Sequence, residues 1–257
     1  MTMDTDVTSA LPFVAPCRAV ATDAPLRWLR LGWRDLCAAP LQSLMYGGFI
    51  TVLSALLCAV ALRFGTGWLV VVLLSGFIFV APALAIGVYA ISAALERGHA
   101  ASLRDCVVAT RRDVGDVLVY SLILMVICLV WVRAGSAVEI FFPAEAAPSR
   151  ETLIAFFAIG SAVGTIFAVG VFAASAFALP MLVDRRADAV TAVVTSVNAV
   201  LRNKRAMLVW ALLIVLSVGV GFATALVGLA VTMPLIGHAT WHAYRETIDA
   251  SAWPEKP

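Results

Sequence analysis

The chain has 257 residues, of which 62% are apolar and only 13% are charged, whereas about a quarter of the residues of a soluble domain are charged. Its mean hydropathy is +0.98, and its apolar residues fall in blocks too long for a soluble core. This composition excludes a soluble globular protein and indicates one solvated by a bilayer. The net charge of +2 gives no reason to expect nucleic acid as a partner, since the basic residues are not gathered on one face.

Residues 1–25 contain Asp4 and Asp6 but no basic segment followed by an apolar core. We therefore expect no cleavable signal peptide, and the first membrane helix should act as the targeting signal. The sequence predicts a disordered cytoplasmic arm over 1–25, a single membrane domain over 26–249 and a cytoplasmic tail over 250–257.

Uncharged blocks predict an all-α, polytopic membrane bundle with six transmembrane helices. A helix needs about 20 apolar residues to cross a hydrocarbon layer of about 30 Å, and most of these blocks are that long. The predicted spans are residues 43–62, 67–95, 117–132, 153–183, 206–220 and 222–243.

The last two spans are drawn from one run, 206–244, that has no Asp, Glu, Lys or Arg. As a single helix this run would be about 58 Å long, nearly twice the hydrocarbon thickness. Gly219 and Gly221 flank Val220, and glycine supplies the backbone freedom of a tight turn. We therefore predict a turn there and two spans; five spans, with one long helix, is the alternative.

The basic residues predict the orientation of the spans. With six spans and the N-terminus inside, 15 of the 18 Lys and Arg residues lie on the inner side, and the three outside are Arg63, Arg133 and Arg150. By the positive-inside rule both termini should be cytoplasmic. A five-span chain would export its tail and still leave 13 basic residues inside.

A short amphipathic stretch on the inner side precedes each odd-numbered span, which suggests a threefold repeat of helical hairpins. The alternative is that these residues only mark the membrane interface. The three apolar stripes are Leu26, Leu29, Trp33 and Leu36; Leu103, Cys106, Val107, Thr110 and Val114; and Val190, Val193, Val194, Val197 and Leu201. The aromatic residues that follow them are Tyr46, Tyr120 and Trp210, and the prolines of the even-numbered spans are Pro82, Pro180 and Pro234.

These stretches predict three interfacial helices on the cytoplasmic face. In the fourth span, Gly160 and Gly164 form a G-x-x-x-G pattern that Ala168 continues. Small residues at this spacing let membrane helices pack closely, so we expect this face of the span to pack against a neighbouring helix.

The predicted spans contain no Asp, Glu, Lys or Arg, although proton relays and ion sites inside membranes are built from such residues. This argues against a pump or an intramembrane hydrolase, and we expect the chain not to be an enzyme. We therefore assign no catalytic residue.

One cluster near the end of the last span could bind an ion. His238 and His242 are four residues apart and Glu246 extends the same row, so a helix places all three on one face. Imidazole is a common metal ligand, so these three residues are the candidate metal site. The alternative is a polar and aromatic collar, formed by His238, Trp241, His242 and Tyr244, where the span leaves the bilayer.

Several segments resemble the bacterial integral-membrane family called domain of unknown function 2189. They are Trp33-Arg-Asp-Leu with Pro40, the stretch from Pro82 through Tyr89-Ala-Ile-Ser to Leu95-Glu-Arg-Gly, and the run Pro234-Leu-Ile-Gly-His-Ala-Thr-Trp-His-Ala-Tyr-Arg245. The resemblance implies a multi-span inner-membrane protein without an established activity. Some relatives are labelled cytochrome c oxidase subunit I, but a haem-copper core needs several buried histidine ligands, and this chain has three histidines.

Three functions remain open from the sequence. The first is a non-catalytic scaffold or accessory protein that packs with other membrane proteins or with lipid. The second is a transporter or channel for a weakly polar solute, lined by the proline-containing helices. The third is a metal-binding or haem-binding accessory factor of a respiratory oxidase, in which His238 and His242 hold the cofactor.

Overall fold

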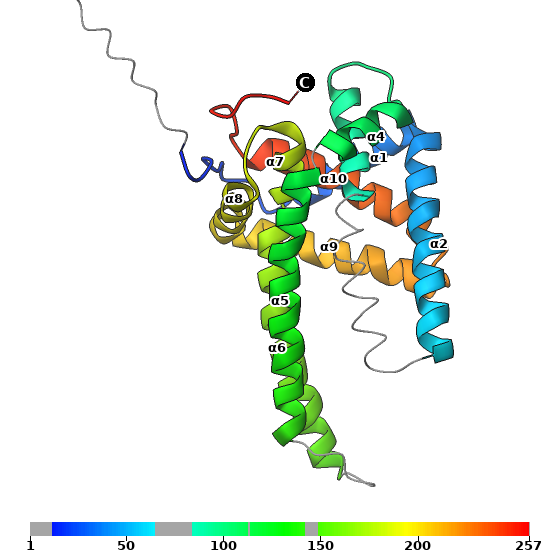
Figure 1. Ribbon diagram of the computed structural model, residues 1–257, viewed down its shortest axis with the longest axis vertical. Helices are drawn as coiled ribbons and strands as arrows, with labels where there is room; N and C mark the ends of the chain where they lie inside the picture. Colours follow the sequence, from blue (N-terminus) through cyan, green and yellow to red (C-terminus); the bar gives the residue numbers. More distant parts are fainter. Residues whose placement is uncertain (1–11, 65–83, 113, 142–148, 257) are drawn as a thin grey trace, which may run out of the picture.

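The computed structural model of the chain describes residues 12–64, 84–112, 114–141 and 149–256, which are predominantly helical (Figure 1). The helices are α1 (Ala24–Ala38), α2 (Pro40–Phe64), an unlabelled helix (Leu84–Glu96), α4 (Leu103–Arg112), α5 (Val114–Phe141), α6 (Arg150–Ser175), α7 (Ala178–Asp184), α8 (Ala189–Arg202), α9 (Lys204–Ala223) and α10 (Leu229–Thr247).

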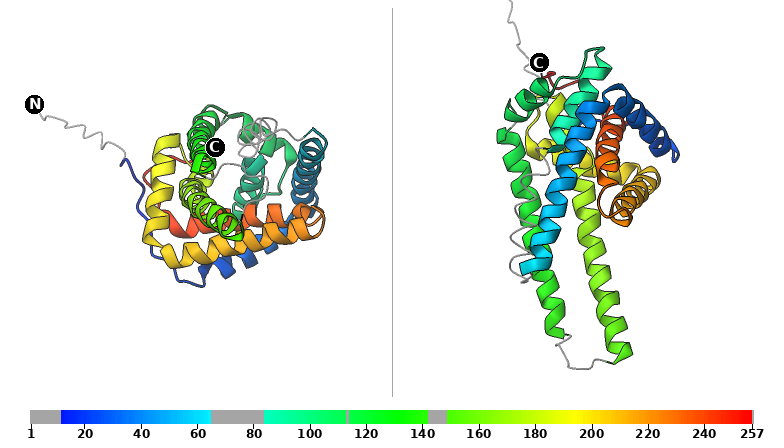
Figure 2. Two further views of the ribbon diagram at one scale, coloured as in Figure 1. Left: turned by 90° about the horizontal axis from the view of Figure 1, so that it is seen from below. Right: turned by 90° about the vertical axis from the view of Figure 1, so that its right-hand side faces the viewer.

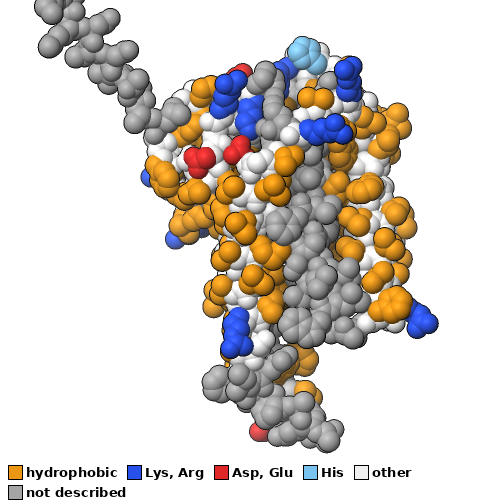
Figure 3. All heavy atoms as spheres, viewed as in Figure 1, with side chains coloured by type: hydrophobic (Ala, Val, Ile, Leu, Met, Phe, Trp, Pro, Cys, Tyr) orange, Lys and Arg blue, Asp and Glu red, His pale blue; other side chains and the backbone are white. Residues whose placement is uncertain are grey.

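Among the described residues, four helical segments are long and apolar enough to cross a membrane: Pro40–Phe64, Val114–Val138, Arg150–Asp184 and Lys204–Ala223. They contain the predicted first, third, fourth and fifth spans. The predicted second span lies mostly outside the described residues, and its described part is the shorter helix Leu84–Glu96. Hydrophobic side chains cover the long helices, and most of the visible Lys and Arg gather toward one end of the molecule (Figure 3), as expected for a membrane protein.

The three amphipathic stretches form α1, α4 and α8, close to their predicted positions. In α8, Thr195 and Ser196 are fully buried, while Val190 and Leu201 are 46% and 57% exposed. The hydroxyl of Thr195 accepts a hydrogen bond from the backbone N–H of Ala15, at 3.0 Å. The small and polar side of α8 therefore faces the protein. Val190 and Leu201 are free to meet lipid, whereas Val193 and Val197 pack partly against the core.

The long fourth span breaks between α6 and α7, where the Ser196 hydroxyl enters the helical hydrogen-bond ladder. It donates to the carbonyl of Ala173, at 2.7 Å, and accepts from the N–H of Phe177, at 3.0 Å. These two backbone groups would bond to each other in a continuous helix. Pro180 adds to the break because it has no N–H to offer the Ala176 carbonyl. A side chain inserted into the ladder and a proline are both known causes of helix kinks.

Replacing Ser196 with alanine should lower the free energy of unfolding by about 1–3 kcal/mol, because two buried backbone groups lose their partner. The matched control is Ser136→Ala, since Ser136 bonds only to the Val132 carbonyl of its own helix and its loss should cost less than about 0.5 kcal/mol. Unfolding in mild detergent measures both. Equal losses for the two variants would contradict the bridging role of Ser196.

The turn in the last apolar run lies later than predicted. α9 continues through Gly219 and Gly221 to Ala223, and the turn follows at residues 224–228. The turn is closed by the N–H of Leu226, which donates to the Gly221 carbonyl at 2.8 Å, and by the N–H of Gly228, which donates to the Thr224 hydroxyl at 2.8 Å. Gly221 serves packing instead, because a Cβ there would lie 2.2 Å from a methyl carbon of Leu229.

The hairpin of α9 and α10 lies across the direction of α2, α5 and α6 (Figures 1 and 2). The Ala230 carbonyl, near the turn, is so close to Gly47 of α2 that a Cβ on Gly47 would lie 1.9 Å from it. His238 meets Ser43, one turn earlier in α2. Between these two contacts, α10 covers eight residues, or about 12 Å of helix, whereas α2 covers only four residues, or about 6 Å. The turn therefore lies far short of Arg63, the single basic residue of α2.

This arrangement corrects the predicted sixth span. Residues 222–243 do not form one crossing helix: they contain the turn, and α10 is not among the helices long and apolar enough to cross a membrane. The polar residues of its second half explain this difference, because they give α10 a much lower mean hydropathy than α9.

Close helix packing uses other glycines than those predicted. A Cβ added to Gly160 or Gly164 would meet no described atom within 4 Å. The G-x-x-x-G face of α6 therefore makes no close helix contact among the described residues, and Gly164 lines a cavity between α6 and α5. The close contacts surround α10 instead: a Cβ on Gly32 of α1 would lie 2.7 Å from the Ala239 nitrogen, and one on Gly237 would lie 2.7 Å from a Val88 methyl carbon. Small residues thus bring neighbouring helices against α10.

Both ends of the described chain pack against the helices. The N–H of Arg18 donates to the Thr247 carbonyl, and the N–H of Asp249 donates to the Pro16 carbonyl, each at 2.8 Å. Pro16 and Arg18 are therefore bonded to the end of α10 and the residues after it. Residues 1–11 of the predicted disordered arm lie outside the described residues. In the tail, Trp253 is buried, and the N–H of Arg186 donates to the Pro254 carbonyl at 2.9 Å.

Candidate functional site

The candidate site is the second half of α10, where a polar row lies inside an otherwise apolar protein. His238, His242 and Glu246 follow one another at four-residue spacing along α10, as predicted, and we call them the α10 row. Pro234 lies inside α10 without ending it. α1, α2 and α9 all contact α10, so the row is enclosed by other parts of the chain.

His238 lies at the buried end of the row and is 0% exposed. Its Nε2 is 2.9 Å from the Ser43 hydroxyl, and its Nδ1 is 2.7 Å from the Ser92 hydroxyl. The Ser43 hydroxyl donates its single hydrogen to the Ala39 carbonyl, at 2.8 Å, so it must accept from His238. Nε2 of His238 therefore carries a hydrogen. Complete burial favours the uncharged ring, in which Nδ1 has no hydrogen and accepts from Ser92.

The other two members of the row contact α1. His242 Nε2 is 2.8 Å from a carboxylate oxygen of the buried Asp35. The Glu246 carboxylate accepts from the Trp28 indole N–H, at 2.9 Å, and from the Arg27 guanidinium. Because the three residues have separate partners, the row fastens α10 to α1, α2 and the helix Leu84–Glu96.

The neighbouring edge of α10 carries a second set of polar contacts. The Trp241 indole and the Arg245 guanidinium donate to the two carboxylate oxygens of Glu96, at 2.9 and 3.1 Å. The Tyr244 hydroxyl donates to Asp184 at 2.8 Å, and Arg245 reaches the same carboxylate oxygen at 3.2 Å. Burial, reinforced by the Asp184 carboxylate, raises the pKa of Tyr244, so this hydroxyl keeps its proton and remains a donor.

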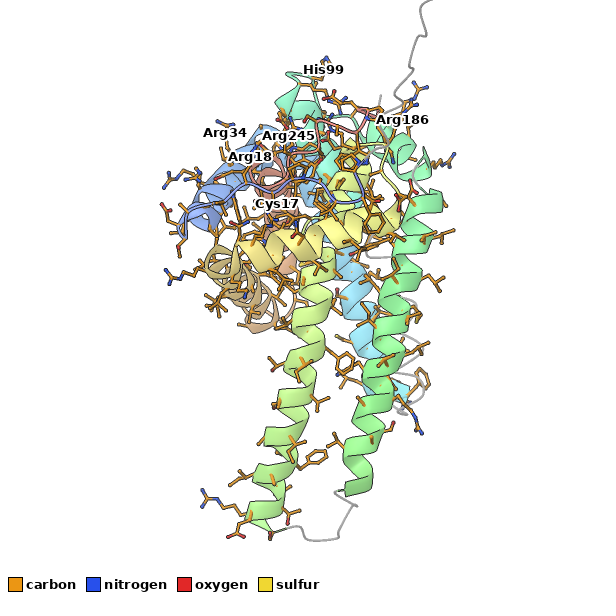
Figure 4. All side chains as sticks on the ribbon, turned by 90° about the vertical axis from the view of Figure 1, so that its left-hand side faces the viewer. Cys17, Arg18, Arg34, His99, Arg186 and Arg245 are labelled. Carbon is orange, nitrogen blue, oxygen red and sulfur yellow. The ribbon has the colours of Figure 1, made fainter. Side chains whose placement is uncertain are left out.

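These contacts decide between the two interpretations of the row only in part. The collar interpretation is wrong for His238, Trp241 and Tyr244, which are buried within the protein. The predicted metal ligands lie on one face, but no group of three or more His, Cys, Asp or Glu side chains among the described residues could hold a metal ion. Metal binding at His238, His242 and Glu246 therefore stays a prediction. His99 is exposed and points away from the helices (Figure 4).

Sequence reasoning missed the partners of the row. Ser43, Ser92 and Asp35 lie between 146 and 207 residues from the histidines they contact, so no local spacing could connect them. One signal in the sequence could have pointed to these partners. Acidic residues are scarce, and an acid that lies beside an apolar segment needs a polar partner when it is buried. Asp35 and Asp184, whose side chains are 7% and 11% exposed, are acids of this kind.

Comparison with known proteins confirms the family resemblance. Residues 69–184 match the family model described as predicted integral membrane protein (DUF2189). The chain matches no curated protein and no solved structure. The match identifies a multi-pass integral membrane protein, and the family description gives no activity.

Proposed function

We propose that this chain is a non-catalytic protein of the bacterial inner membrane, with both termini cytoplasmic, that packs with other membrane proteins or with lipid. The observation that carries the proposal is that the side chains of the α10 row bond to other side chains of the same protein. Both ring nitrogens of His238 are hydrogen-bonded, and His242 and Glu246 face carboxylate, indole and guanidinium groups of α1. The row is therefore engaged in contacts within the protein, which supports a structural role for it.

The exposed apolar surface supports packing as the main activity. On α9, the side chains of Leu212, Val215 and Leu216 are more than half exposed. On α6, the side chains of Phe157, Ile166 and Val169 are also more than half exposed. Such surfaces are covered by lipid or by another membrane helix.

The cavities give weaker support to the transporter alternative. The cavity between α5 and α6 has a volume of about 450 Å³ and is lined by apolar residues, glycine and Cys128; the cavity beside α10 has about 120 Å³, with Thr240 and Tyr89 as its polar lining. A path for a weakly polar solute would need more polar groups than these walls provide.

Photo-crosslinking in cells tests the packing proposal. We expect a photoreactive residue at Val215, which is 67% exposed, to give adducts with one defined membrane protein or with lipid. The same residue in place of the buried Trp210 should react only within the chain. If Val215 gave no adduct, and if the protein purified in mild detergent as an inert monomer without co-purifying protein or lipid, the proposal would be wrong.

A further inference from the structure

The basic residues at the cytoplasmic end of the molecule differ in whether they are already paired. Four arginines of this end form ion pairs inside the protein: Arg18 with Asp249, Arg27 with Glu246, Arg185 with Asp184 and Arg245 with Glu96. In contrast, Arg202, Lys204 and Arg205 are exposed, and none of them forms an ion pair with a described acidic residue. We call these three cations the α8–α9 corner.

The corner lies where two apolar surfaces meet. Leu201, next to Arg202, ends the exposed apolar side of α8, and Leu208, one turn after Lys204, begins that of α9; they are 57% and 63% exposed. Three cations between two lipid-facing surfaces are placed at the depth of the phospholipid headgroups.

The corner is also held rigidly, because Asn203 at its centre is buried. Its side-chain oxygen accepts from the N–H of Val20, at 2.9 Å, and its amide donates to the Arg18 carbonyl, at 3.1 Å. Beyond the corner, the rings of Trp210 in α9 and Trp28 in α1 pack edge to face with centroids 5.7 Å apart. The three cations are thus presented by a fixed turn.

We propose that Arg202, Lys204 and Arg205 bind the phosphate groups of anionic phospholipids and so hold the α8–α9 corner at the cytoplasmic membrane surface. A zwitterionic lipid carries its own cation beside the phosphate, so only an anionic lipid leaves a net negative charge for the corner. Each Lys or Arg near an anionic surface contributes about 1 kcal/mol, which corresponds to about a five-fold change in association. The inference rests on the lipid-binding form of the proposed function.

Spin-labelled lipids in reconstituted vesicles test this inference on the full chain. The vesicles consist of phosphatidylcholine, with trace amounts of spin-labelled phosphatidylglycerol in one sample and spin-labelled phosphatidylcholine in the other. We expect the wild type to prefer phosphatidylglycerol, and R202Q/K204Q/R205Q to lose at least about ten-fold of that preference at low salt. The control R63Q/R133Q/R150Q removes the same charge from the opposite end and should keep the preference.

Two further measurements distinguish the source of the phosphate and the cause of any loss. R202K/R205K keeps the charge and should keep the preference, which separates loss of charge from loss of folding. Inorganic phosphate, added at equal ionic strength to a chloride control, should displace little lipid if the bilayer headgroup is the ligand. A triple glutamine variant that retains the preference, or a control variant that loses it equally, would overturn the inference. The adducts at Val215 do not depend on the corner, so the packing proposal can fail or hold separately.

Discussion

A cysteine in place of Val227, in the turn between α9 and α10, should not react with a membrane-impermeant maleimide added to the outside of intact spheroplasts. The reason is the depth at which the turn lies in the membrane. The Ala230 carbonyl lies against Gly47, and 16 residues of α2 separate Gly47 from Arg63, which corresponds to about 24 Å along the helix. Most of a hydrocarbon layer of about 30 Å therefore lies between the turn and the outer surface.

The experiment needs a chain in which the five native cysteines are replaced by alanine. Val227 itself is 69% exposed in the isolated chain, so protection of the cysteine would come from lipid and not from the protein. Arg63→Cys is the outer control and should react fully, while His99→Cys should react only after the membrane is permeabilised. Labelling at position 227 equal to that at position 63 would restore six crossing spans.

The result also bears on the topology of the whole chain. If α9 and α10 enter and leave on the same side, the C-terminus remains cytoplasmic without a fifth and sixth crossing. A reporter fused after Pro257 should therefore be cytoplasmic in both arrangements, and only the turn distinguishes them. The charge bias predicts a cytoplasmic tail for either arrangement, because both return the chain to the inner surface.

Features set by local periodicity were predictable from the sequence. The stripes that begin at Leu26, Leu103 and Val190 predicted α1, α4 and α8 because an amphipathic helix shows its period within a few turns. The row His238, His242 and Glu246 was predictable for the same reason. The burial of these residues was not, since it depends on helices from distant parts of the sequence.

Features set by contact between helices were not predictable. Gly219 and Gly221 suggested a turn, but the chain turns at 224–228, with positive φ at Ala225 and Leu226, and it uses Gly221 to admit Leu229. Glycine in a membrane helix permits either a turn or a close approach, and only the neighbouring helix decides which. Gly160 and Gly164 show the converse, because their spacing suggested close packing, whereas a Cβ at either position would meet no described atom within 4 Å.

The buried histidine of the α10 row should contribute more to stability than any other polar side chain of the row. His238→Leu keeps an apolar volume but leaves the Ser92 hydroxyl without its acceptor and removes the donor to Ser43, in a place that water does not reach. Unpaired buried polar groups cost about 1–3 kcal/mol each, so we expect a loss of about 2–4 kcal/mol in the free energy of unfolding in mild detergent.

Two variants separate hydrogen bonding from simple damage to packing. His238→Gln offers both a donor and an acceptor and should recover part of the loss, whereas His99→Leu, in an exposed loop, should change stability by less than about 0.5 kcal/mol. Metal analysis and an absorption spectrum of the same purified samples test the other role of the row. A stoichiometric metal or haem in the wild type, lost in both His238→Ala and His242→Ala, would show that the row binds a cofactor. It would require Ser43 or Ser92 to release the ring, since both nitrogens of His238 are otherwise occupied.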